Sequence, residues 1–556
     1  MLPETVFMDL PHLRDLGPRQ FPRQVERLLW HLGFTDVATI DGAGDGGGDI
    51  IGRHNGKDWV LQCKWKLRGA IGADAVDEVA RARELYRANE AAVVTTSQPG
   101  PAARKRAGEL SALAPPIKFW TGDVLRRAYD RAADRLPSRD LRDYQRTAVR
   151  ALQSSLSKDG RALLVLATGM GKTVVGGNVI DQHLKRYPVD DILVIAHTKD
   201  LVAQLERALW PHLPKAIRTR LVTGDERPDD LSGVTCATVA SALSAAKAGY
   251  RPKLIMVDEA HHIAEDGQFA ELLSILSAAA QFGVTATPWR GDGYDLTRHF
   301  GEASYTLGIE DGMRRGYLAQ VDYRLFVDDI DWDMVRSASQ YSYSLSELNA
   351  RLFLPQRDDA IRDELTVAWS NVTRPRGIIF CRTIEHAERM SSLLNGASPW
   401  GSVRAIHAGL TARQRQTRLL EFRSGSVPLL TAVDILNEGV DIPDVNILCF
   451  ARVTHSRRIF VQQLGRGLRL RDGKTSVVVL DFVSDLRRIA ATLKLRRDLE
   501  ADSVEVLPLH AKSSITFSDQ RVESLMDEWI LDAASLETAY DEHRLQFPEV
   551  TAIQKG

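Results

Sequence analysis

The chain has 556 residues, of which 44% are hydrophobic and 26% are charged. Single hydrophobic cores stop growing at about 250–300 residues, so a chain of this length is expected to form several domains. The 72 Lys and Arg residues nearly balance the 73 Asp and Glu residues, which leaves a formal net charge of −1. This balance excludes a uniformly basic protein, and any surface that binds nucleic acid must be local.

The four cysteines lie far apart and lack the CxxC or Cys/His spacing of a zinc site. Their distribution argues against zinc and against a disulfide framework, and it predicts a reduced, cytoplasmic protein. No apolar run reaches about 18 residues, and the N-terminus lacks the basic and apolar regions of a secretion signal. We therefore expect neither secretion nor membrane insertion.

The first part of the chain has the pattern of a helix followed by strands. Residues 21–32 place apolar side chains at helical spacing, with Glu26 near but off the main apolar stripe. The segment 41–52 is too rich in glycine for a regular element, and 59–65, WVLQCKW, alternates like a strand. A helix, a glycine-rich turn and a strand are therefore expected in this order.

Three polar residues are expected to converge in this region. Asp49 stands at the mouth of one strand, and Gln62 and Lys64 share a face of the next, because residues two apart in a strand point the same way. Asp49 and Gln62 can bind a divalent metal while Lys64 orients or activates an attacking water beside a phosphate. Singly, each has a structural alternative: Asp49 can cap a glycine turn, and Lys64 can be solvated.

The ordered set of Asp49, Gln62, Lys64 and the upstream helical Glu26 resembles the Mrr-type branch of the PD-(D/E)xK restriction-endonuclease fold. The resemblance covers roughly residues 18–132. It implies a Mg²⁺-dependent endonuclease whose catalytic residues are these four and whose metal ligands are Asp49 and Gln62. Gln62 departs from the acidic residue of the wider fold, and an uncharged amide is a weaker ligand, so the number of metals stays open.

The segment 163–173, LLVLATGMGKT, has the pattern of a strand, a phosphate-binding turn and the start of a helix. Glycines in the turn let backbone N–H groups point at phosphates, the lysine supplies charge for the β- and γ-phosphates, and the threonine hydroxyl can hold Mg²⁺. The strict motif has glycine where Leu166 stands. The candidate ATP-binding residues here are Thr168, Gly169, Gly171, Lys172 and Thr173, and Thr173 is also a metal candidate.

Further polar residues follow predicted strands, where parallel sheets bind ligands. Asp258 and Glu259 open the sequence DEAH after a strand at 254–257. Asp258 is expected to hold Mg²⁺, and Glu259 to polarise the attacking water. His261 is expected to link this site to Thr285 and Thr287 after the next strand.

A second parallel sheet is expected to begin near Gly377 and to end with the sequence QQLGRGLR at 462–469. Arg466 and Arg469 are three residues apart and share a helical face. Arginines delivered to the γ-phosphate from a second lobe raise the hydrolysis rate by ~10³–10⁵. Both are therefore candidate catalytic residues.

The segment from Leu141 to about Val483 is similar to superfamily 2 helicases, because all their motifs occur in order. DEAH combined with QQLGRGLR resembles restriction-type DNA translocases and excision-repair helicases more closely than RNA-processing DEAH proteins. The resemblance implies that Gln145 reads adenine and that Asp441 contributes to the nucleotide site. It also implies ATP, Mg²⁺ and DNA as ligands. The residues expected on the nucleic-acid side are Thr198, the turn at 235–241, Arg382, His407 and Thr431.

The predicted fold class is α/β throughout. The expected parts are a restriction-endonuclease-like domain (1–136), a first RecA-like lobe (137–324), a partly helical linker (325–370), a second RecA-like lobe (371–485) and a helical C-terminal extension (486–556).

The leading interpretation is an ATP-dependent DNA helicase or translocase coupled to a Mg²⁺-dependent endonuclease that restricts foreign DNA. Two alternatives stay open: a motor whose first domain only binds DNA, and an RNA remodeller, which the last motif and the nuclease pattern disfavour. Because no methyltransferase motif or target-recognition domain follows, separate modification or defence subunits are candidate partners. Oligomeric state is left open.

Overall fold

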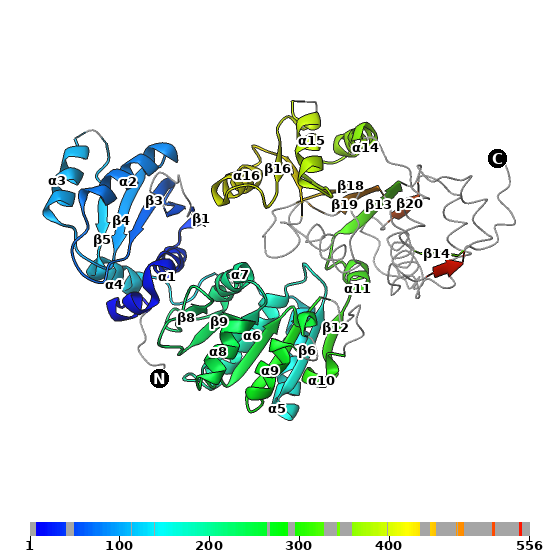
Figure 1. Cartoon of the computed structure of the whole chain (residues 1–556), viewed down its shortest axis with the longest axis horizontal. Coiled ribbons are helices and arrows are strands. Elements are labelled where there is room, and N and C mark those ends of the chain that lie inside the picture. Colours follow the sequence, from blue (N-terminus) through cyan, green and yellow to red (C-terminus); the bar gives the residue numbers. More distant parts are fainter. Residues whose placement is uncertain are drawn as a thin grey trace. The chain divides into compact units, whose positions relative to one another are not determined.

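The computed structural model describes residues 7–40, 49–112, 114–137, 140–263, 267–286, 295–326, 342–344, 358–396, 399–433, 445–451, 474, 476–482, 514–517 and 544–546. The chain divides into two compact units, whose elements are shown in Figure 1. One unit comprises Met1–Leu166 and Gly171–Thr306, and the other comprises Ala167–Met170 and Leu307–Gly556.

The first domain of the first unit has one five-stranded sheet in the order β1-β2-β3-β4-β5. Strands β1, β2 and β3 pair antiparallel, whereas β3, β4 and β5 pair parallel. The elements in chain order are α1 (Leu10–His31), β1 (Thr35–Thr39), β2 (Ile50–His54), β3 (Lys57–Lys64), α2 (Ala73–Leu85), β4 (Glu90–Thr95), α3 (Pro101–Leu110), β5 (Lys118–Trp120) and α4 (Gly122–Arg131).

The alternation of side chains along β3 and β4 supplies two separate cores. Leu61 and Val94 pack with apolar residues of α1 and α4. Val60 and Val93 pack on the other face, with apolar residues of α2 and α3. The two helix pairs therefore cover opposite faces of the sheet, and each position on β3 is assigned to one of them.

The second domain of this unit is built on a seven-stranded sheet in the order β12-β6-β11-β10-β7-β9-β8. From β6 to β8 all neighbouring strands pair parallel, and helices cover both faces, as parallel sheets require (Figure 1). Its elements are α5 (Asp143–Asp159), β6 (Arg161–Leu166), α6 (Lys172–Arg186), β7 (Ile192–Ala196), α7 (Lys199–Leu209), β8 (Thr219–Val222), β9 (Val234–Thr238), α8 (Val239–Lys247), β10 (Leu254–Asp258), α9 (Gln268–Ile275), β11 (Ala280–Thr285), α10 (Thr297–Phe300) and β12 (Ala303–Leu307).

The second unit has another seven-stranded sheet, in the order β16-β17-β15-β18-β19-β13-β20, whose neighbours all pair parallel. A separate antiparallel pair joins β14 (Ser342–Ser344) to β21 (Arg544–Gln546). The other elements are α11 (Ile309–Arg314), β13 (Gln320–Phe326), α14 (Asp358–Ser370), β15 (Gly377–Phe380), α15 (Ile384–Leu394), β16 (Val403–Ile406), α16 (Ala412–Ser424), β17 (Leu429–Ala432), β18 (Ile447–Ala451), β19 (Ser476–Phe482) and β20 (Ser514–Phe517).

The expected fold class is confirmed, but three expected segments differ from the structure. Strand β13 is expected mainly in the first lobe, yet it pairs with β19 and β20 in the sheet of the second unit. Helix α14, expected in a linker, packs its buried residues Ile361 and Leu365 into that unit's core. The C-terminal extension, expected to be helical, contributes strands β20 and β21. Strand pairing over long sequence distances places the strands, and burial of apolar side chains places α14.

None of the helices in the described part of the chain is long and apolar enough to cross a bilayer. The four cysteines are free thiols, and three of them are buried.

His12 on α1 gives a testable pH dependence of stability. Burial, the largest cause, and the guanidinium groups of Arg220, Arg218 and Arg27 together lower the pKa of His12 to about 3, against the opposing effect of the Asp230 carboxylate. Between about pH 6.5 and 3 the unfolded chain binds a proton at this ring that the folded chain does not bind. The free energy of unfolding should therefore fall with falling pH, by up to about 1.4 kcal/mol per pH unit for this group.

Replacing this ring by an apolar side chain, His12→Leu, should reduce the loss of stability between pH 7 and pH 5. Urea unfolding of the wild type and the variant at both pH values measures this difference. An equal loss in both proteins would show that His12 takes up its proton in the folded state.

Candidate active sites

The phosphate turn between β6 and α6 depends on glycine at two positions. Gly169 and Gly171 have φ angles of +88° and +85°, a region that L side chains rarely adopt. A Cβ at Gly171 would also lie 2.6 Å from the amide nitrogen of Gln145. Gly171 precedes the first residue of α6, Lys172, so the turn leads into a helix N-terminus, which favours bound anions.

Gln145 lies in the first turn of α5 and is buried. Its side-chain oxygen accepts a hydrogen bond from the backbone N–H of Arg142 at 3.0 Å. This hydrogen bond holds the Gln145 side-chain amide next to Gly171, beside the start of α6. Its expected contact with adenine remains a prediction.

The carboxylates of the DEAH segment lie at the carboxyl end of β10, opposite the lysine of the turn. Nζ of Lys172 is 3.6 Å from Oε1 of Glu259. Asp258 is buried, and burial together with the adjacent Glu259 raises the pKa of Asp258 to about 7, against the opposing effect of Lys172. Its Oδ1 is buried without a hydrogen-bond partner in the described part of the chain. A bound cation would stabilise this carboxylate, so the residue fits Mg²⁺.

Glu259 has a φ of +47°, which is uncommon for a residue with a side chain and marks a position held by its surroundings. Its Oε2 is 3.4 Å from Nδ1 of His261. The same ring nitrogen is 2.9 Å from Oγ1 of Thr285 at the end of β11, so the expected link between His261 and Thr285 is confirmed. The ring of His262, which has no place in the predicted site, stacks on His197 with centroids 3.9 Å apart.

Several predicted motor residues lie outside the described residues: Thr287, Asp441, Arg466 and Arg469. Two residues expected to face nucleic acid have other partners. Oγ1 of Thr431 donates to the backbone oxygen of Ala387 at 2.8 Å, and the side chain is fully buried. His407 is also buried, and its Nε2 lies 2.7 Å from Oε1 of Glu388. Thr431 therefore packs inside its lobe instead of lining a surface.

The β2–β3 pairing brings the predicted nuclease residues together. Ile50 pairs with Leu61, so Asp49 lies beside the strand segment that carries Gln62 and Lys64. Oδ2 of Asp49 accepts a hydrogen bond from the backbone N–H of Cys63. Gln62 is buried, and its Oε1 has no hydrogen-bond partner among the described residues. A buried amide oxygen beside a carboxylate is a donor set that suits Mg²⁺.

Sequence reasoning missed Glu78. The Nζ atom of Lys64 forms an ion pair with the Glu78 carboxylate, which α2 places over the face of β3 that carries Gln62 and Lys64. An acidic residue on a helix has no local signature that links it to a strand 14 positions earlier. Its role becomes visible only when α2 packs on the sheet.

In the part of the chain that the structure describes, no group of three or more His, Cys, Asp or Glu side chains is arranged to hold a metal ion. Mg²⁺ is commonly bound through one or two carboxylates together with substrate phosphates and several waters. Asp258 and Thr173 in the motor, and Asp49 and Gln62 in the nuclease domain, are sufficient for sites of this kind.

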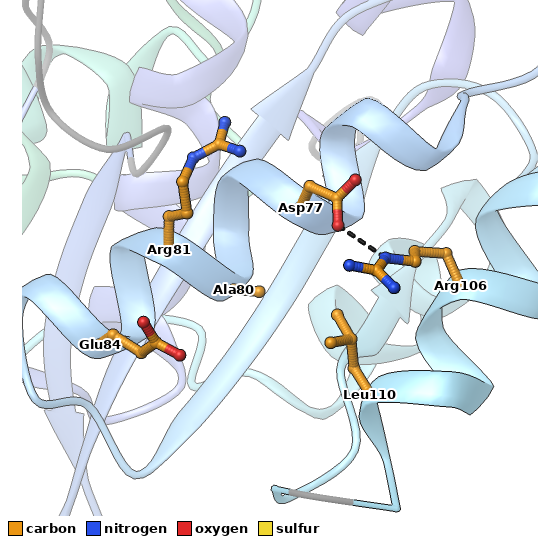
Figure 2. Close-up of a pocket in the computed structure, with 6 residues that line it drawn as sticks. All are labelled: Asp77, Ala80, Arg81, Glu84, Arg106 and Leu110. Atoms are coloured by element: carbon orange, nitrogen blue, oxygen red, sulfur yellow. Dashed lines mark hydrogen bonds and ion pairs between the residues drawn. The ribbon is translucent and has the colours of Figure 1, made fainter.

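A hollow between α2 and α3 is separate from these residues (Figure 2). The ion pair between Nε of Arg106 and Oδ1 of Asp77, at 2.7 Å, crosses it. Its remaining lining consists of Ala80, Arg81, Glu84 and Leu110. Acidic and basic groups occur here in equal number, so the hollow shows no preference for an anion or a cation, and we assign no ligand to it.

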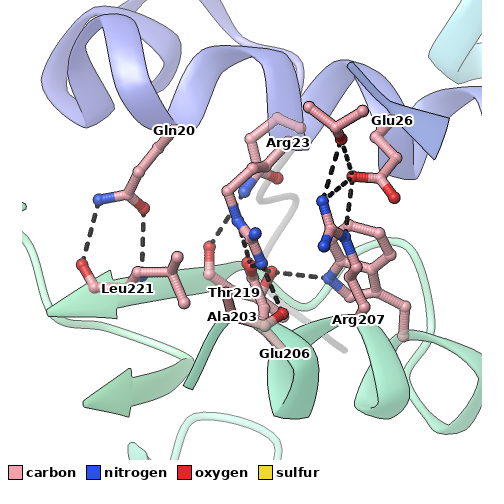
Figure 3. Close-up of polar contacts among 11 residues, drawn as sticks. Gln20, Arg23, Glu26, Ala203, Glu206, Arg207, Thr219 and Leu221 are labelled. Carbon is pink, nitrogen blue, oxygen red and sulfur yellow. Dashed lines mark hydrogen bonds and ion pairs between the residues drawn. The ribbon is translucent and has the colours of Figure 1, made fainter. Parts of the chain in front are cut away.

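The structure does not join Glu26 to the nuclease residues. Glu26 is on α1, which covers the sheet face opposite to the one that carries Gln62 and Lys64. Its Oε2 accepts hydrogen bonds from Thr39 Oγ1 at 3.0 Å and from Nη2 and Nε of Arg207 at 2.8 and 3.0 Å (Figure 3). This corrects the assignment of Glu26 as a catalytic residue, because its carboxylate is committed to the motor domain.

Two parallel sheets, one with a phosphate turn and a DEAH segment at the ends of its strands, define the motor of a superfamily 2 helicase or translocase. The five-stranded domain before it resembles an Mrr-type restriction endonuclease and carries Asp49, Gln62 and Lys64 as candidate site residues.

Family models match three successive parts of the chain. Residues 13–129 match the model described as restriction endonuclease, residues 138–290 match type III restriction enzyme, res subunit, and residues 356–471 match helicase conserved C-terminal domain. The chain therefore combines a restriction endonuclease domain with the two lobes of a restriction-type helicase.

Each of the following relatives matches about two thirds of the chain. The chain is 29% identical to "Putative mitochondrial ATP-dependent helicase irc3" of Schizosaccharomyces pombe, over 68% of this chain and 63% of the relative. It is 24% identical to the type I restriction enzyme EcoAI endonuclease subunit of Escherichia coli, over 66% of this chain and 50% of that subunit. It is 25% identical to the DNA 3'-5' translocase XPB2 of Sulfurisphaera tokodaii, over 61% and 81%. The first of these matches spans less than two thirds of the relative.

A solved structure shows the same fold over nearly the whole chain. The ATP-dependent type ISP restriction-modification enzyme LlaBIII, bound to DNA, superposes with a TM-score of 0.52 at 17% identity. The match covers 95% of this chain and 42% of that enzyme.

The geometry of the phosphate turn predicts the effect of Gly171→Ala. The new methyl group would meet the Gln145 amide, and the left-handed φ would cost about 1–2 kcal/mol. ATP binding, measured by titration with a fluorescent analogue, should weaken by at least about tenfold, the change that 1.4 kcal/mol produces.

Gly160→Ala is the matched control, because Gly160 also has a positive φ, +65°, but a Cβ there meets no atom within 4 Å. It should lose similar stability and keep its affinity for ATP. Equal weakening in both variants would show that backbone strain, and not the contact with Gln145, controls the site.

The ion pair of Lys64 predicts a role for Glu78. Glu78→Gln keeps the shape of the side chain but removes the charge that holds the Lys64 ammonium. DNA cleavage should fall by about 10-fold or more, as is typical when the partner of a site residue is lost, with ATP hydrolysis unchanged. In a Lys64→Ala background the same change should have no further effect, and an additional loss there would contradict this role.

Proposed function

We propose that the chain is an ATP-driven DNA translocase or helicase that carries a Mg²⁺-dependent endonuclease and restricts foreign DNA. The observation that carries the proposal is that two groups of residues suited to phosphate chemistry belong to the same compact unit. The DEAH carboxylates face the phosphate-turn lysine in one domain, and Asp49, Gln62 and Lys64 share a sheet edge in the other.

In the motor, Lys172 would contact the β- and γ-phosphates of ATP, and Thr173 and Asp258 would hold Mg²⁺. Glu259 would accept a proton from the attacking water, with His261 and Thr285 holding it in place. Arg466 and Arg469 would stabilise the charge of the transferring phosphoryl group, so that hydrolysis depends on closure of the second lobe.

In the nuclease domain, Asp49 and Gln62 would hold Mg²⁺, which when bound polarises the scissile phosphate and its attacking water. Lys64 would orient the water beside that phosphate, and Glu78 would hold the lysine. No residue of this group reads base sequence, so target choice would depend on modified bases or on separate modification or defence subunits.

The relatives support DNA as the substrate, because a restriction enzyme subunit and a DNA translocase are among them. Four free cysteines support a reducing, cytoplasmic location. A second candidate function keeps the motor and makes the first domain a DNA clamp without cleavage. The buried Oε1 of Gln62, which has no hydrogen-bond partner among the described residues, favours cleavage, because a clamp has no use for a metal-binding oxygen there.

Separate loss of the two activities tests this proposal. Lys172→Ala and Glu259→Gln should each abolish ATP hydrolysis, and Glu259→Gln should still bind ATP. Asp49→Ala and Lys64→Ala should each stop DNA cleavage and leave ATP hydrolysis intact. The measurements are phosphate release and nicking of plasmid DNA, modified and unmodified, with Mg²⁺ and either ATP or a non-hydrolysable analogue.

Cleavage by the wild-type protein should require hydrolysable ATP, because a nuclease that is always active would endanger the cell's own DNA. Equal cleavage by wild type and Lys172→Ala would refute this coupling and leave the nuclease assignment standing. Cleavage by Asp49→Ala would refute the nuclease assignment itself.

A further inference from the structure

Helix α1 of the nuclease domain covers the edge strand of the motor sheet. Strand β8 is the last strand of that sheet, so its outer N–H and C=O groups need partners other than a strand. The Gln20 amide supplies both: it donates to the oxygen of Leu221 at 3.1 Å and accepts from the N–H of Leu221 at 3.1 Å (Figure 3). Gln24 donates to the oxygen of Thr219 at 3.4 Å. Side chains of α1 thus replace a neighbouring strand.

Two ion pairs of opposite direction join α1 to α7 next to this edge (Figure 3). Arg23 of α1 donates through Nε to Oε2 of Glu206 at 2.9 Å. Glu26, one helical turn later on α1, accepts from Arg207, the residue that follows Glu206 on α7. Each helix therefore contributes one acidic and one basic residue. Both ion pairs can form in only one position of α1 along α7.

The Arg23–Glu206 pair is buried, and in the second pair Glu26 is buried whereas the side chain of Arg207 is 30% exposed. The exposed fractions are 8% for Arg23, 2% for Glu26 and 0% for Glu206. The other Glu206 oxygen accepts from Thr219 Oγ1 at 2.6 Å, and the rings of Trp30 and Trp210 pack edge to face beside the pairs, with centroids 5.4 Å apart. Separation of the domains would leave each of these charged groups without its partner. A buried charge without its partner is strongly destabilising, so the docked arrangement is favoured.

We propose that this contact, the α1–α7 joint formed by Gln20, Arg23, Glu26, Glu206, Arg207 and Leu221, fixes the nuclease domain to the first motor lobe. Glu26 is a positioning residue of the joint and takes no part in the cleavage reaction. The nuclease site then moves with the first lobe throughout the ATPase cycle. The consequence for cleavage rests on the proposed function, whereas the joint itself does not.

Helix α7 links the α1–α7 joint to the part of the first lobe that is expected to contact DNA. Helix α7 begins next to Thr198, whose hydroxyl accepts from the N–H of Leu201 at 3.3 Å and which belongs to the motif expected to contact nucleic acid. The same helix ends one turn after it meets Arg23 and Glu26. One rigid element therefore connects the DNA-contacting end of the first lobe to the nuclease domain, and cleavage should act on DNA held by that lobe.

Charge reversal and charge exchange in the full-length protein test the joint. Arg207→Glu should place two acids together, whereas Glu26→Arg combined with Arg207→Glu restores an ion pair with its direction exchanged. Hydrogen exchange of the peptide that contains Leu221 reports docking, because the N–H of Leu221 is bonded to Gln20 across the joint. This peptide should exchange at least about tenfold faster in Arg207→Glu and should regain most of its protection in the double variant.

The same proteins separate a positioning role from a catalytic one. ATP-dependent DNA cleavage should fall at least about tenfold in Arg207→Glu and recover to within about threefold of wild type in the double variant. Glu26→Gln is the milder variant, which keeps the shape of the side chain and should show intermediate exchange and cleavage. Arg106→Glu, which breaks the exposed pair with Asp77 between α2 and α3, is the control and should change neither measurement.

Two results would overturn the proposal. If the double variant regains protection at Leu221 but not cleavage, Glu26 acts in the reaction. If Arg207→Glu keeps the wild-type exchange rate, the ion pair does not hold the domains together. Failure of the proposed nuclease function is distinguishable, because cleavage by Asp49→Ala would reveal it while the exchange measurement still reports the joint.

Discussion

Parallel strand pairing is the constraint on which the motor site depends. Asp258, at the end of β10, pairs with Val284, and the next residue on β11, Thr285, pairs with Val165 of β6. The carboxyl ends of three strands therefore meet at one end of the sheet. Asp258 and Thr285 are the last residues of β10 and β11, and Glu259 follows β10 directly. Because the strands are buried on both faces, this end is stiff, which keeps Glu259 in an unfavourable backbone conformation and holds it opposite Lys172.

The contact between the two domains of the first unit shows how burial changes the value of a charge pair. Breaking a buried pair by removing one partner typically costs about 3–5 kcal/mol, whereas an exposed pair is worth about 0–1 kcal/mol. The Arg23–Glu206 pair is of the first kind, and the pair of Asp77 and Arg106, with side chains 36% and 40% exposed, is of the second. The Glu26–Arg207 pair lies between the two kinds, because the Arg207 side chain is 30% exposed. Buried ion pairs contribute little net stability compared with apolar packing. Their effect here is to allow only one position of α1 along α7.

Local sequence patterns predicted which site residues lie together within one strand or turn. They did not predict contacts between residues that are far apart in the sequence. Alternation along one strand placed Gln62 and Lys64 together, and the glycines of the segment 163–173 predicted a tight turn, in which Gly171 has a left-handed conformation. The partner of Glu26 is Arg207, 181 residues later, and no periodicity connects them. Strand β13 looked like the end of the first lobe because its place in the second sheet is decided by pairing with β19, which lies about 150 residues away. A helical glutamate near a nuclease motif was read by family resemblance as catalytic, and only the packing of α1 shows that its carboxylate faces the motor.

In both candidate sites the lysine lies next to a glutamate from another element. Lys172 lies beside Glu259, and Lys64 is paired with Glu78, so each ammonium expected to meet a phosphate already has a carboxylate neighbour on another element. The γ-phosphate of ATP carries more negative charge than one carboxylate, so it would compete for Lys172 and release Glu259, the proposed proton acceptor for water. A DNA phosphodiester carries the same single charge as a carboxylate, so Lys64 would keep its pair with Glu78 when DNA binds. In the nuclease domain the glutamate would therefore hold the lysine in place, whereas in the motor ATP binding would free the base.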